Sequence, residues 1–174
     1  MIVLKLISKL IKALRSNATP VQLSWGFVLG MFPGLTPPWN AHNLLIAVLI
    51  IILNVNISMA ILAFLFFSLF AYLLDPLFHE LGYFLLVEVS FLESVWLFVS
   101  QAPVMAYFNL NNTVVLGSLL VCILLIVPVF LLMKRFVVYY RERLEERIKK
   151  LKIVQALMGS KLYSWFERLQ KLGE

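Results

Sequence analysis

All 15 lysine and arginine residues of this chain lie near its two ends, within residues 5–15 and 134–171. The interval 16–133 carries four formal charges, all of them acidic: Asp75, Glu80, Glu88 and Glu93. The apolar runs on either side of this acidic group are long enough to enter or cross a bilayer. This distribution indicates a membrane protein that leaves a basic compartment and returns to it, as the positive-inside rule describes.

The composition supports the same interpretation. Hydrophobic residues make up 62% of the 174-residue chain, which is more apolar surface than a soluble domain of this size can bury. We therefore predict an all-α, polytopic integral membrane protein. The net charge of +6 flanks hydrophobic segments, so the expected partner is anionic phospholipid of the cytoplasmic leaflet and not nucleic acid. Cys122 lies in an apolar run without a companion cysteine, which indicates a packing or lipid-facing role.

Both ends of the chain are expected to form amphipathic helices on the cytoplasmic side of a bacterial inner membrane. Residues 1–16 predict an interfacial helix without a cleavage site after it, so it is expected to be retained. Residues 134–174 predict a cytoplasmic helical tail, because acidic and basic residues alternate there at helical spacing. The residues expected to bind the membrane surface are Lys5, Lys9, Lys12 and Arg15.

The membrane domain, residues 17–133, begins with a hairpin over residues 20–53. Thr19-Pro20 and Thr36-Pro37 each match a helix N-cap followed by the first helical residue, so two short helices are predicted. Pro33-Gly34 is expected to end the first helix, which then rises about 20 Å against a hydrocarbon core of about 30 Å. The hairpin is therefore either re-entrant or a tight full hairpin, and both return the chain to the side it entered.

Two clear transmembrane spans are predicted after the hairpin. Residues 57–74 form an unbroken apolar run that is expected to end at Asp75-Pro76. Residues 75–111 contain the acidic side chains and many aromatic ones, which favours a periplasmic segment that receives a partner. Residues 112–133 return to the cytoplasmic side, and Pro128 within them is tolerated by neighbouring helices.

The hairpin supplies the candidate site. Its glycines recur every four residues, which predicts a packing groove inside the hairpin; the alternative is a groove for a lipid chain or a partner helix. The polar group at its tip either binds a phosphate or carboxylate through free N–H groups, or reaches the far interface and caps the helix. The candidate lipid- or partner-binding residues are Gly26, Gly30, Pro33, Gly34, Thr36, Pro37, Pro38, Trp39, Asn40, His42 and Asn43.

A second polar group, Asp75, His79 and Glu80, has the spacing of two metal ligands or of an acid–base pair. A third protein ligand is not nearby in the sequence, so a helix cap at Asp75 followed by an interfacial histidine is the preferred interpretation. Because no catalytic constellation, metal site or cofactor motif is evident, we expect a protein that is not an enzyme.

Two stretches of sequence resemble a known family. The first stretch contains the runs Ala18-Thr19-Pro20 and Gly26-Phe27-Val28-Leu29-Gly30-Met31-Phe32-Pro33-Gly34-Leu35-Thr36-Pro37-Pro38. These runs resemble the signature of the uncharacterised bacterial membrane family called domain of unknown function 2062. The run Asn111-Asn112-Thr113-Val114-Val115-Leu116-Gly117-Ser118 is similar to a proteobacterial subgroup of this length. The resemblance implies the fold and a companion role to a large, membrane-anchored periplasmic envelope protein. It implies no catalytic residue, since the family has no established activity.

These observations lead to one main functional hypothesis and two alternatives. The main hypothesis is a non-enzymatic subunit of an envelope-assembly or phospholipid-transport system, in which the glycine-lined hairpin forms a wedge open to lipid or to the cytoplasmic side. The first alternative is a small-solute permease or channel, which would act as a homo-oligomer because the chain has one broken pair of helices. The second is a lipid-modifying enzyme that uses His42, Asp75, His79 and Glu80.

Overall fold

The first described helix, α2 (Pro20–Leu35), begins as its sequence predicts. The Thr19 side chain accepts a hydrogen bond from the Gln22 backbone N–H at 3.2 Å, and the Gln22 side chain accepts one from the Thr19 N–H at 2.8 Å. This reciprocal capping box satisfies two N–H groups that a helix start would otherwise leave free. The computed structural model describes residues 13, 14 and 16–144.

The end of α2 differs from the prediction. Pro33 lies inside the helix, which continues to Leu35. Pro33 has no N–H to donate and so removes one helical hydrogen bond, but it does not end the helix. Thr36 is the C-cap of α2 and not the N-cap of the next helix, because its backbone N–H bonds back to the Phe32 carbonyl oxygen at 2.9 Å. The next helix, α3 (Ala41–Ile52), starts later than predicted, after Asn40.

Helix α4 (Ile57–Tyr83) passes through Asp75-Pro76, where the sequence predicted its end. The prediction that Asp75 caps a helix was therefore wrong. Proline is tolerated inside a membrane helix that neighbouring helices support, and α4 packs against both α2 and α6. Asn56 caps its start by accepting a hydrogen bond from the Met59 N–H at 2.9 Å.

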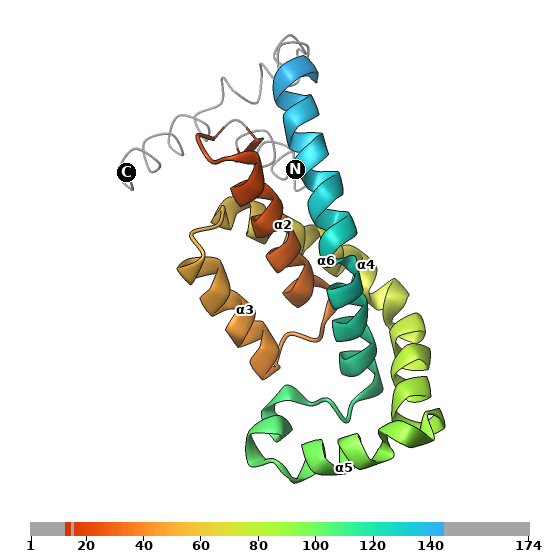
Figure 1. Cartoon of the computed structure of the whole chain (residues 1–174). Helices are drawn as coiled ribbons and strands as arrows, with labels where there is room; N and C mark the ends of the chain where they lie inside the picture. The colour runs from red at the N-terminus through yellow and green to blue at the C-terminus, as the bar shows by residue number, and fades with distance from the viewer. Residues whose placement is uncertain (1–12, 15, 145–174) are drawn as a thin grey trace.

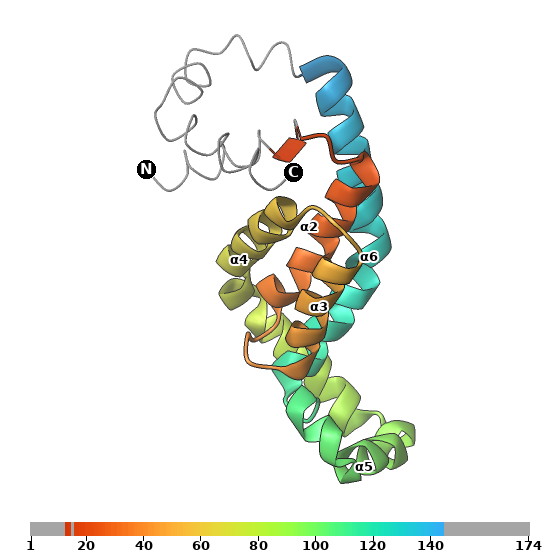
Figure 2. The same cartoon turned by 90° about the vertical axis from the view of Figure 1, so that its left-hand side faces the viewer.

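A short irregular segment joins α4 to the last long helix. It consists of the π-helical turn η1 (Phe84–Glu88), the 3₁₀ turn η2 (Ser90–Leu92), α5 (Glu93–Gln101) and the 3₁₀ turn η3 (Pro103–Phe108). Helix α6 (Thr113–Tyr139) follows, capped by Asn112, and ends in the π-helical turn η4 (Tyr140–Leu144). Figures 1 and 2 place α5 at one end of the molecule and the C-terminal half of α6 at the other.

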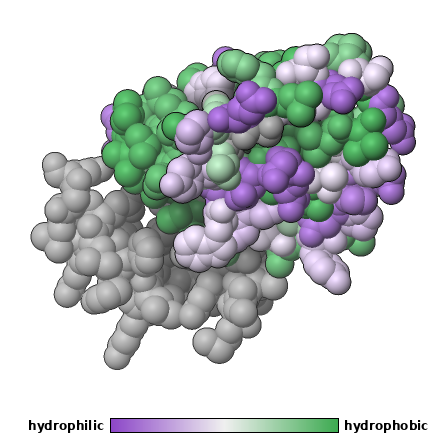
Figure 3. All heavy atoms as spheres, turned by 90° about the horizontal axis from the view of Figure 1, so that it is seen from below, coloured by the Kyte–Doolittle hydropathy of each residue, from purple (hydrophilic) through white to green (hydrophobic). Residues whose placement is uncertain are grey.

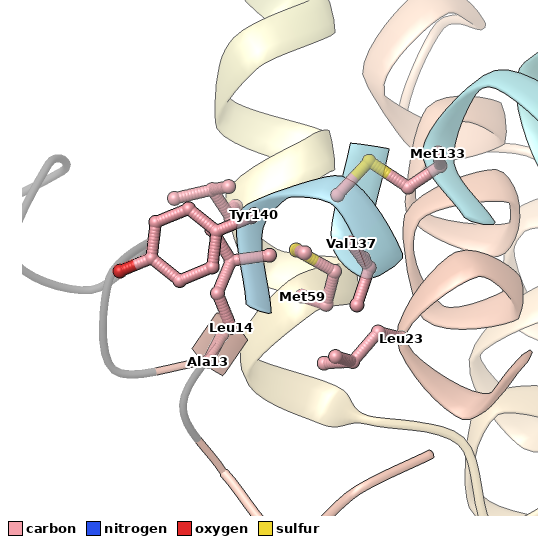
Figure 4. Close-up of a cluster of buried hydrophobic side chains, with 8 residues drawn as sticks. Ala13, Leu14, Leu23, Met59, Met133, Val137 and Tyr140 are labelled. Atoms are coloured by element: carbon pink, nitrogen blue, oxygen red, sulfur yellow. The ribbon is translucent and has the colours of Figure 1, made fainter. Parts of the chain in front are cut away.

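Helices α2, α4 and α6 pack against one another, and α3 lies beside α2 (Figure 1). One buried cluster, near the Pro20 end of α2, joins the three helices to Ala13 and Leu14 (Figure 4); its members are Ala13, Leu14, Leu23, Met59, Leu62, Met133, Val137 and Tyr140. A second cluster fills the space further along α2 and consists of Val28, Met31, Phe32, Leu35, Phe78 and Cys122. The described residues are all-helical, as predicted, and contain no strand.

Two of these helical stretches are long and apolar enough to cross a membrane. Only 22% of the most apolar window of Ile57–Glu88 is buried within the protein, and only 28% of that of Thr113–Arg143. Most of their apolar surface therefore faces outward, which is expected when lipid rather than protein covers it. Helix α3 is also apolar and exposed, and only His42 and Asn43 are buried on it.

Candidate functional site

The segment between α2 and α3 is held by side chains that the sequence marked as candidates. The Thr36 hydroxyl lies 2.8 Å from the Phe32 carbonyl oxygen and 2.9 Å from Asn43 Oδ1. Asn43 Nδ2 donates hydrogen bonds to the carbonyl oxygens of Pro37 at 2.8 Å and Pro38 at 3.3 Å. Thr36 and Asn43 are buried and their polar groups are largely used within the turn, so both act mainly to shape it.

Asn40 connects this turn to the segment before α6. Its Nδ2 donates to the Pro37 carbonyl oxygen at 2.8 Å, and its Oδ1 accepts a hydrogen bond from Asn109 Nδ2. Asn109 has a φ of 51°, in the left-handed region that asparagine adopts more readily than most residues. This hydrogen bond joins the tip of the hairpin to the segment that precedes α6.

A cleft of about 500 Å³ lies between these two segments. It is lined by Pro37, Pro38, Trp39, Asn40, Asn109, Asn111, Asn112 and Val115. Four of these side chains are amides, which can both donate and accept hydrogen bonds, and none is basic. A ligand here would be recognised through hydrogen bonds and contact with proline and tryptophan, without a positive charge from the lining residues. We call this cleft the amide cleft.

Trp39 and His42 occupy opposite environments near the amide cleft. Trp39 is 92% exposed, so its ring is available to lipid or to a partner. His42 is only 6% exposed, and neither of its ring nitrogens has a hydrogen-bond partner among the residues that the structure describes. An imidazole without partners is costly to bury, which makes His42 the least satisfied polar group of the described hairpin.

A second cavity, of about 460 Å³, adjoins the segment before α6 on the side of α5. Its wall is mainly apolar and includes Leu86, Glu93, Trp96, Leu97, Val99, Ala106, Asn109, Leu110 and Asn111. The Trp96 ring is fixed by a hydrogen bond from Nε1 to the Leu85 carbonyl oxygen at 2.9 Å. We call this cavity the α5 cavity. Figure 3, seen from this end of the molecule, shows hydrophilic residues gathered among hydrophobic ones.

The glycines have a structural role, but with a different neighbour from the one expected. A Cβ atom on Gly26 would lie 2.5 Å from the Asn56 carbonyl oxygen, and one on Gly30 would lie 2.8 Å from Ala60 Cα. At Gly34 the same atom would lie 2.8 Å from Phe67 Cβ. The glycine groove of α2 is therefore filled by α4 and not by α3. A lipid chain or partner helix in this groove, and a wedge open along it, are incompatible with these contacts.

Asp75, His79 and Glu80 are not among the described residues that line the amide cleft. His79 Nδ1 lies 2.7 Å from Thr113 Oγ1, which ties α4 to the start of α6. Among the described residues no group of three or more His, Cys, Asp or Glu side chains is arranged to hold a metal ion. The membrane-surface candidates Lys5, Lys9, Lys12 and Arg15 lie outside the described residues, as does most of the predicted tail.

Sequence reasoning missed Asn109, Asn111 and Asn112 as site residues, and also Glu93 and Trp96. The available signal was local: three asparagines within four residues precede a long apolar run. Asparagine is a common cap and turn residue, so this pattern alone indicates only the start of a helix. The hydrogen bond between Asn109 and Asn40, 69 positions apart in the sequence, is evident only from the structure.

Comparison with known proteins adds a family but no function. No curated protein and no solved structure matches the chain. The model of the family described as "Uncharacterized protein conserved in bacteria (DUF2062)" matches residues 5–146. This match covers α2 to α6 and both cavities, and it agrees with the resemblance carried by the Gly-Pro signature. The chain belongs to the DUF2062 family of bacterial proteins.

Proposed function

We propose that this protein is an inner-membrane subunit of an envelope-assembly or phospholipid-transport system. In this role it binds phospholipid, or a large membrane-anchored periplasmic partner, at the end of the molecule that carries the amide cleft. The single observation that carries the proposal is the position of this cleft. It lies at the end of two long helices whose exposed apolar flanks suit lipid, and it presents hydrogen-bonding side chains where a lipid-covered surface would end.

The proposed orientation follows from the charges. Lys134, Arg135 and Arg143 are exposed at the far end of α6 from the amide cleft. Basic residues remain preferentially in the cytoplasm, so both termini are cytoplasmic and the amide cleft faces the periplasm. The acidic residues Glu80, Glu88 and Glu93 then lie at the periplasmic end, where acidic residues are tolerated.

The hairpin is proposed to reach the periplasmic interface. Helix α2 has 16 residues, which rise about 24 Å, less than the roughly 30 Å of the hydrocarbon core. The residues that follow α2 bring Asn40 within hydrogen-bond distance of Asn109, which lies in the segment before α6. This contact supports a tight full hairpin rather than a shallow re-entrant one, with the amide cleft at headgroup level in the proposed orientation.

The packing of α2, α4 and α6 favours this proposal over a permease. The space among the three helices is filled by apolar side chains such as Met31, Phe32 and Phe78. A water-filled path for a polar solute between them would require these side chains to move apart. Solute flux into liposomes that contain the purified protein would support the permease instead.

The proposal is tested by exchanging one amide of the cleft. Asn111 is exposed and lines both cavities, and Asn17 is an exposed asparagine at the opposite end of the molecule. The protein is purified in a mild detergent, and co-purifying phospholipid and protein are quantified by mass spectrometry. Asn111→Ala, which removes the amide without adding a charge, is expected to reduce the co-purifying lipid or partner severalfold, while the matched control Asn17→Ala retains it. If both variants retain equal amounts of lipid and partner, the amide cleft binds neither the lipid nor the partner.

A further inference from the structure

The α5 cavity combines an apolar wall with very few polar groups. Its volume of about 460 Å³ is within the range of small-molecule sites. Among its nine lining residues the polar side chains are Glu93, Asn109, Asn111 and the Trp96 indole, whose N–H is already bonded to the Leu85 carbonyl oxygen. Among the described lining residues, the Glu93 carboxylate, the Asn111 amide and the part of the Asn109 amide that is not bonded to Asn40 are thus the polar groups available to a ligand.

The charge of this region selects the kind of ligand. Among the described residues that line the α5 cavity none is basic, and the sequence from residue 16 to residue 133 contains no lysine or arginine. An anionic group in the cavity would meet the Glu93 carboxylate without a compensating cation from the wall. A cationic group would instead gain a charge-assisted hydrogen bond to Glu93. The cavity is therefore complementary to an ammonium group.

The surroundings of the α5 cavity resemble a membrane interface. Large apolar and aromatic side chains are exposed on the same segment, among them Phe84, Phe91, Phe98, Val104 and Tyr107. Such side chains are stable where headgroups meet hydrocarbon, and aromatic residues are enriched at that depth. The ammonium group that enters the cavity is thus expected to arrive from within the lipid layer.

We propose that the α5 cavity binds the headgroup of a zwitterionic aminophospholipid, with Glu93 as the counter-ion of its primary ammonium. The amide N–H groups of Asn109 and Asn111 donate hydrogen bonds to the phosphate of the headgroup, whose negative charge is balanced by the headgroup's own ammonium, and the wall formed by Leu86, Val99 and Leu110 covers the first part of the acyl chains. This inference rests on the proposed function, because it names the class of lipid that the periplasmic end recognises. A lysine of a protein partner offers the same ammonium, but it brings no acyl chain for the apolar wall.

The test compares lipids that differ in the headgroup. The purified full-length protein is delipidated and titrated with phosphatidylethanolamine, phosphatidylglycerol or phosphatidylcholine, and bound lipid is counted by native mass spectrometry. We expect phosphatidylethanolamine to bind more tightly than phosphatidylglycerol. Glu93→Gln, which keeps the size of the side chain, is expected to weaken phosphatidylethanolamine binding about fivefold, as for loss of a partly exposed ion pair. Phosphatidylcholine, whose quaternary ammonium has no N–H donor, is expected to bind less well than phosphatidylethanolamine.

Glu88→Gln is the matched control, because Glu88 is an exposed glutamate of the same segment that does not line the cavity. Its lipid preference is expected to equal that of the wild type. Equal binding of the three lipids, or an equal effect of the two variants, would overturn the inference while leaving lipid binding by the protein intact. Absence of bound lipid from every variant would instead contradict the proposed lipid function. A zero-length carbodiimide cross-link from Glu93 to a partner's lysine in native membranes would overturn the lipid assignment of this cavity.

Discussion

The guanidinium of Arg141 donates a hydrogen bond from Nε to the main-chain carbonyl oxygen of Leu14 at 2.9 Å, across 127 positions of sequence. Its Nη2 donates two more, to the carbonyl oxygens of Ser16 at 2.9 Å and Ala18 at 2.8 Å. These carbonyl groups belong to residues that precede α2, where backbone acceptors have no partner within that helix. One side chain at the end of α6 therefore fixes the entry of the chain into α2.

Replacing Arg141 with alanine is expected to lower the free energy of unfolding by about 2 kcal/mol, because three charge-assisted hydrogen bonds are lost. The corresponding fall in the thermal unfolding midpoint is about 5 °C, measured by tryptophan fluorescence in detergent. Arg141→Lys is expected to recover little of this loss, since an ammonium group lacks the planar fork of donors. Arg143→Ala, at an exposed arginine two positions on, is the control. An Arg141→Ala midpoint no lower than that of Arg143→Ala would contradict the prediction.

Adding a single methyl group at Gly30 is expected to destabilise the protein. The new Cβ would lie 2.8 Å from Ala60 Cα, and a backbone atom cannot move aside as the end of a flexible side chain can. The energetic cost of this clash exceeds the stability that alanine usually adds to a helix relative to glycine. We therefore expect Gly30→Ala to lower the free energy of unfolding by about 2 kcal/mol or more. Ala47→Ser adds one atom at an exposed position of α3 and serves as the control. Thermal unfolding of the two variants is compared, and an unchanged midpoint for Gly30→Ala would argue against close packing of α2 on α4.

The sequence was most informative where a local pattern has one physical outcome. The Thr19-Pro20 start of α2 and the long apolar helices after Asn56 and Asn112 were predicted because capping and apolar length act within neighbouring residues. The same reasoning failed at Thr36-Pro37, which has the local form of a helix start. There the Thr36 backbone and hydroxyl bond back to Phe32 instead, so the residue ends α2.

The sequence predicted only the hairpin side of the candidate site, because the two sides of the site are far apart in the chain. The tip residues, such as Asn40, stood out as polar groups in an apolar segment. Asn109 and Arg141 gave no comparable signal, since their partners are 69 and 127 positions away. Spacing showed that Gly30 lies on a packing face, but the identity of the packing neighbour, α4, depends on tertiary structure.

The hydrogen bond between Asn40 and Asn109 is expected to couple the hairpin to the segment before α6. In a double-mutant cycle of Asn40→Ala and Asn109→Ala, the two losses should be non-additive by about 1 kcal/mol, the usual contribution of one hydrogen bond. Asn109→Gly tolerates the left-handed backbone and loses only the side chain, so it separates hydrogen-bond loss from backbone strain. Strictly additive losses in unfolding free energy would show that the bond contributes nothing to the stability of the cleft.

His42 and Asn43 are adjacent buried polar residues, but replacing each with leucine is expected to change the unfolding midpoint differently. His42→Leu is expected to leave the unfolding midpoint unchanged or to raise it, because the imidazole has no described partner and leucine restores an apolar environment. Asn43→Leu is expected to lower the midpoint by several degrees, since it removes the bonds to Pro37 and Pro38. A large stability loss in His42→Leu would contradict the prediction. Loss of lipid or partner binding by folded His42→Leu would also contradict it, because it would assign His42 a ligand.

Cysteine labelling is expected to place Trp39 and Tyr107 on the periplasmic side. Both side chains are exposed, at 92% and 73%, whereas Cys122 is fully buried and is replaced by alanine to provide a background without thiols. When a membrane-impermeant maleimide is added to the periplasmic side of an intact inner membrane, it should label Trp39→Cys and Tyr107→Cys. It should label Asn17→Cys only after the membrane is disrupted. Labelling of Tyr107→Cys without Trp39→Cys would indicate a re-entrant hairpin whose tip stays within the bilayer. Labelling of Asn17→Cys in intact membranes would reverse the proposed orientation, because the positive-inside rule puts that end in the cytoplasm.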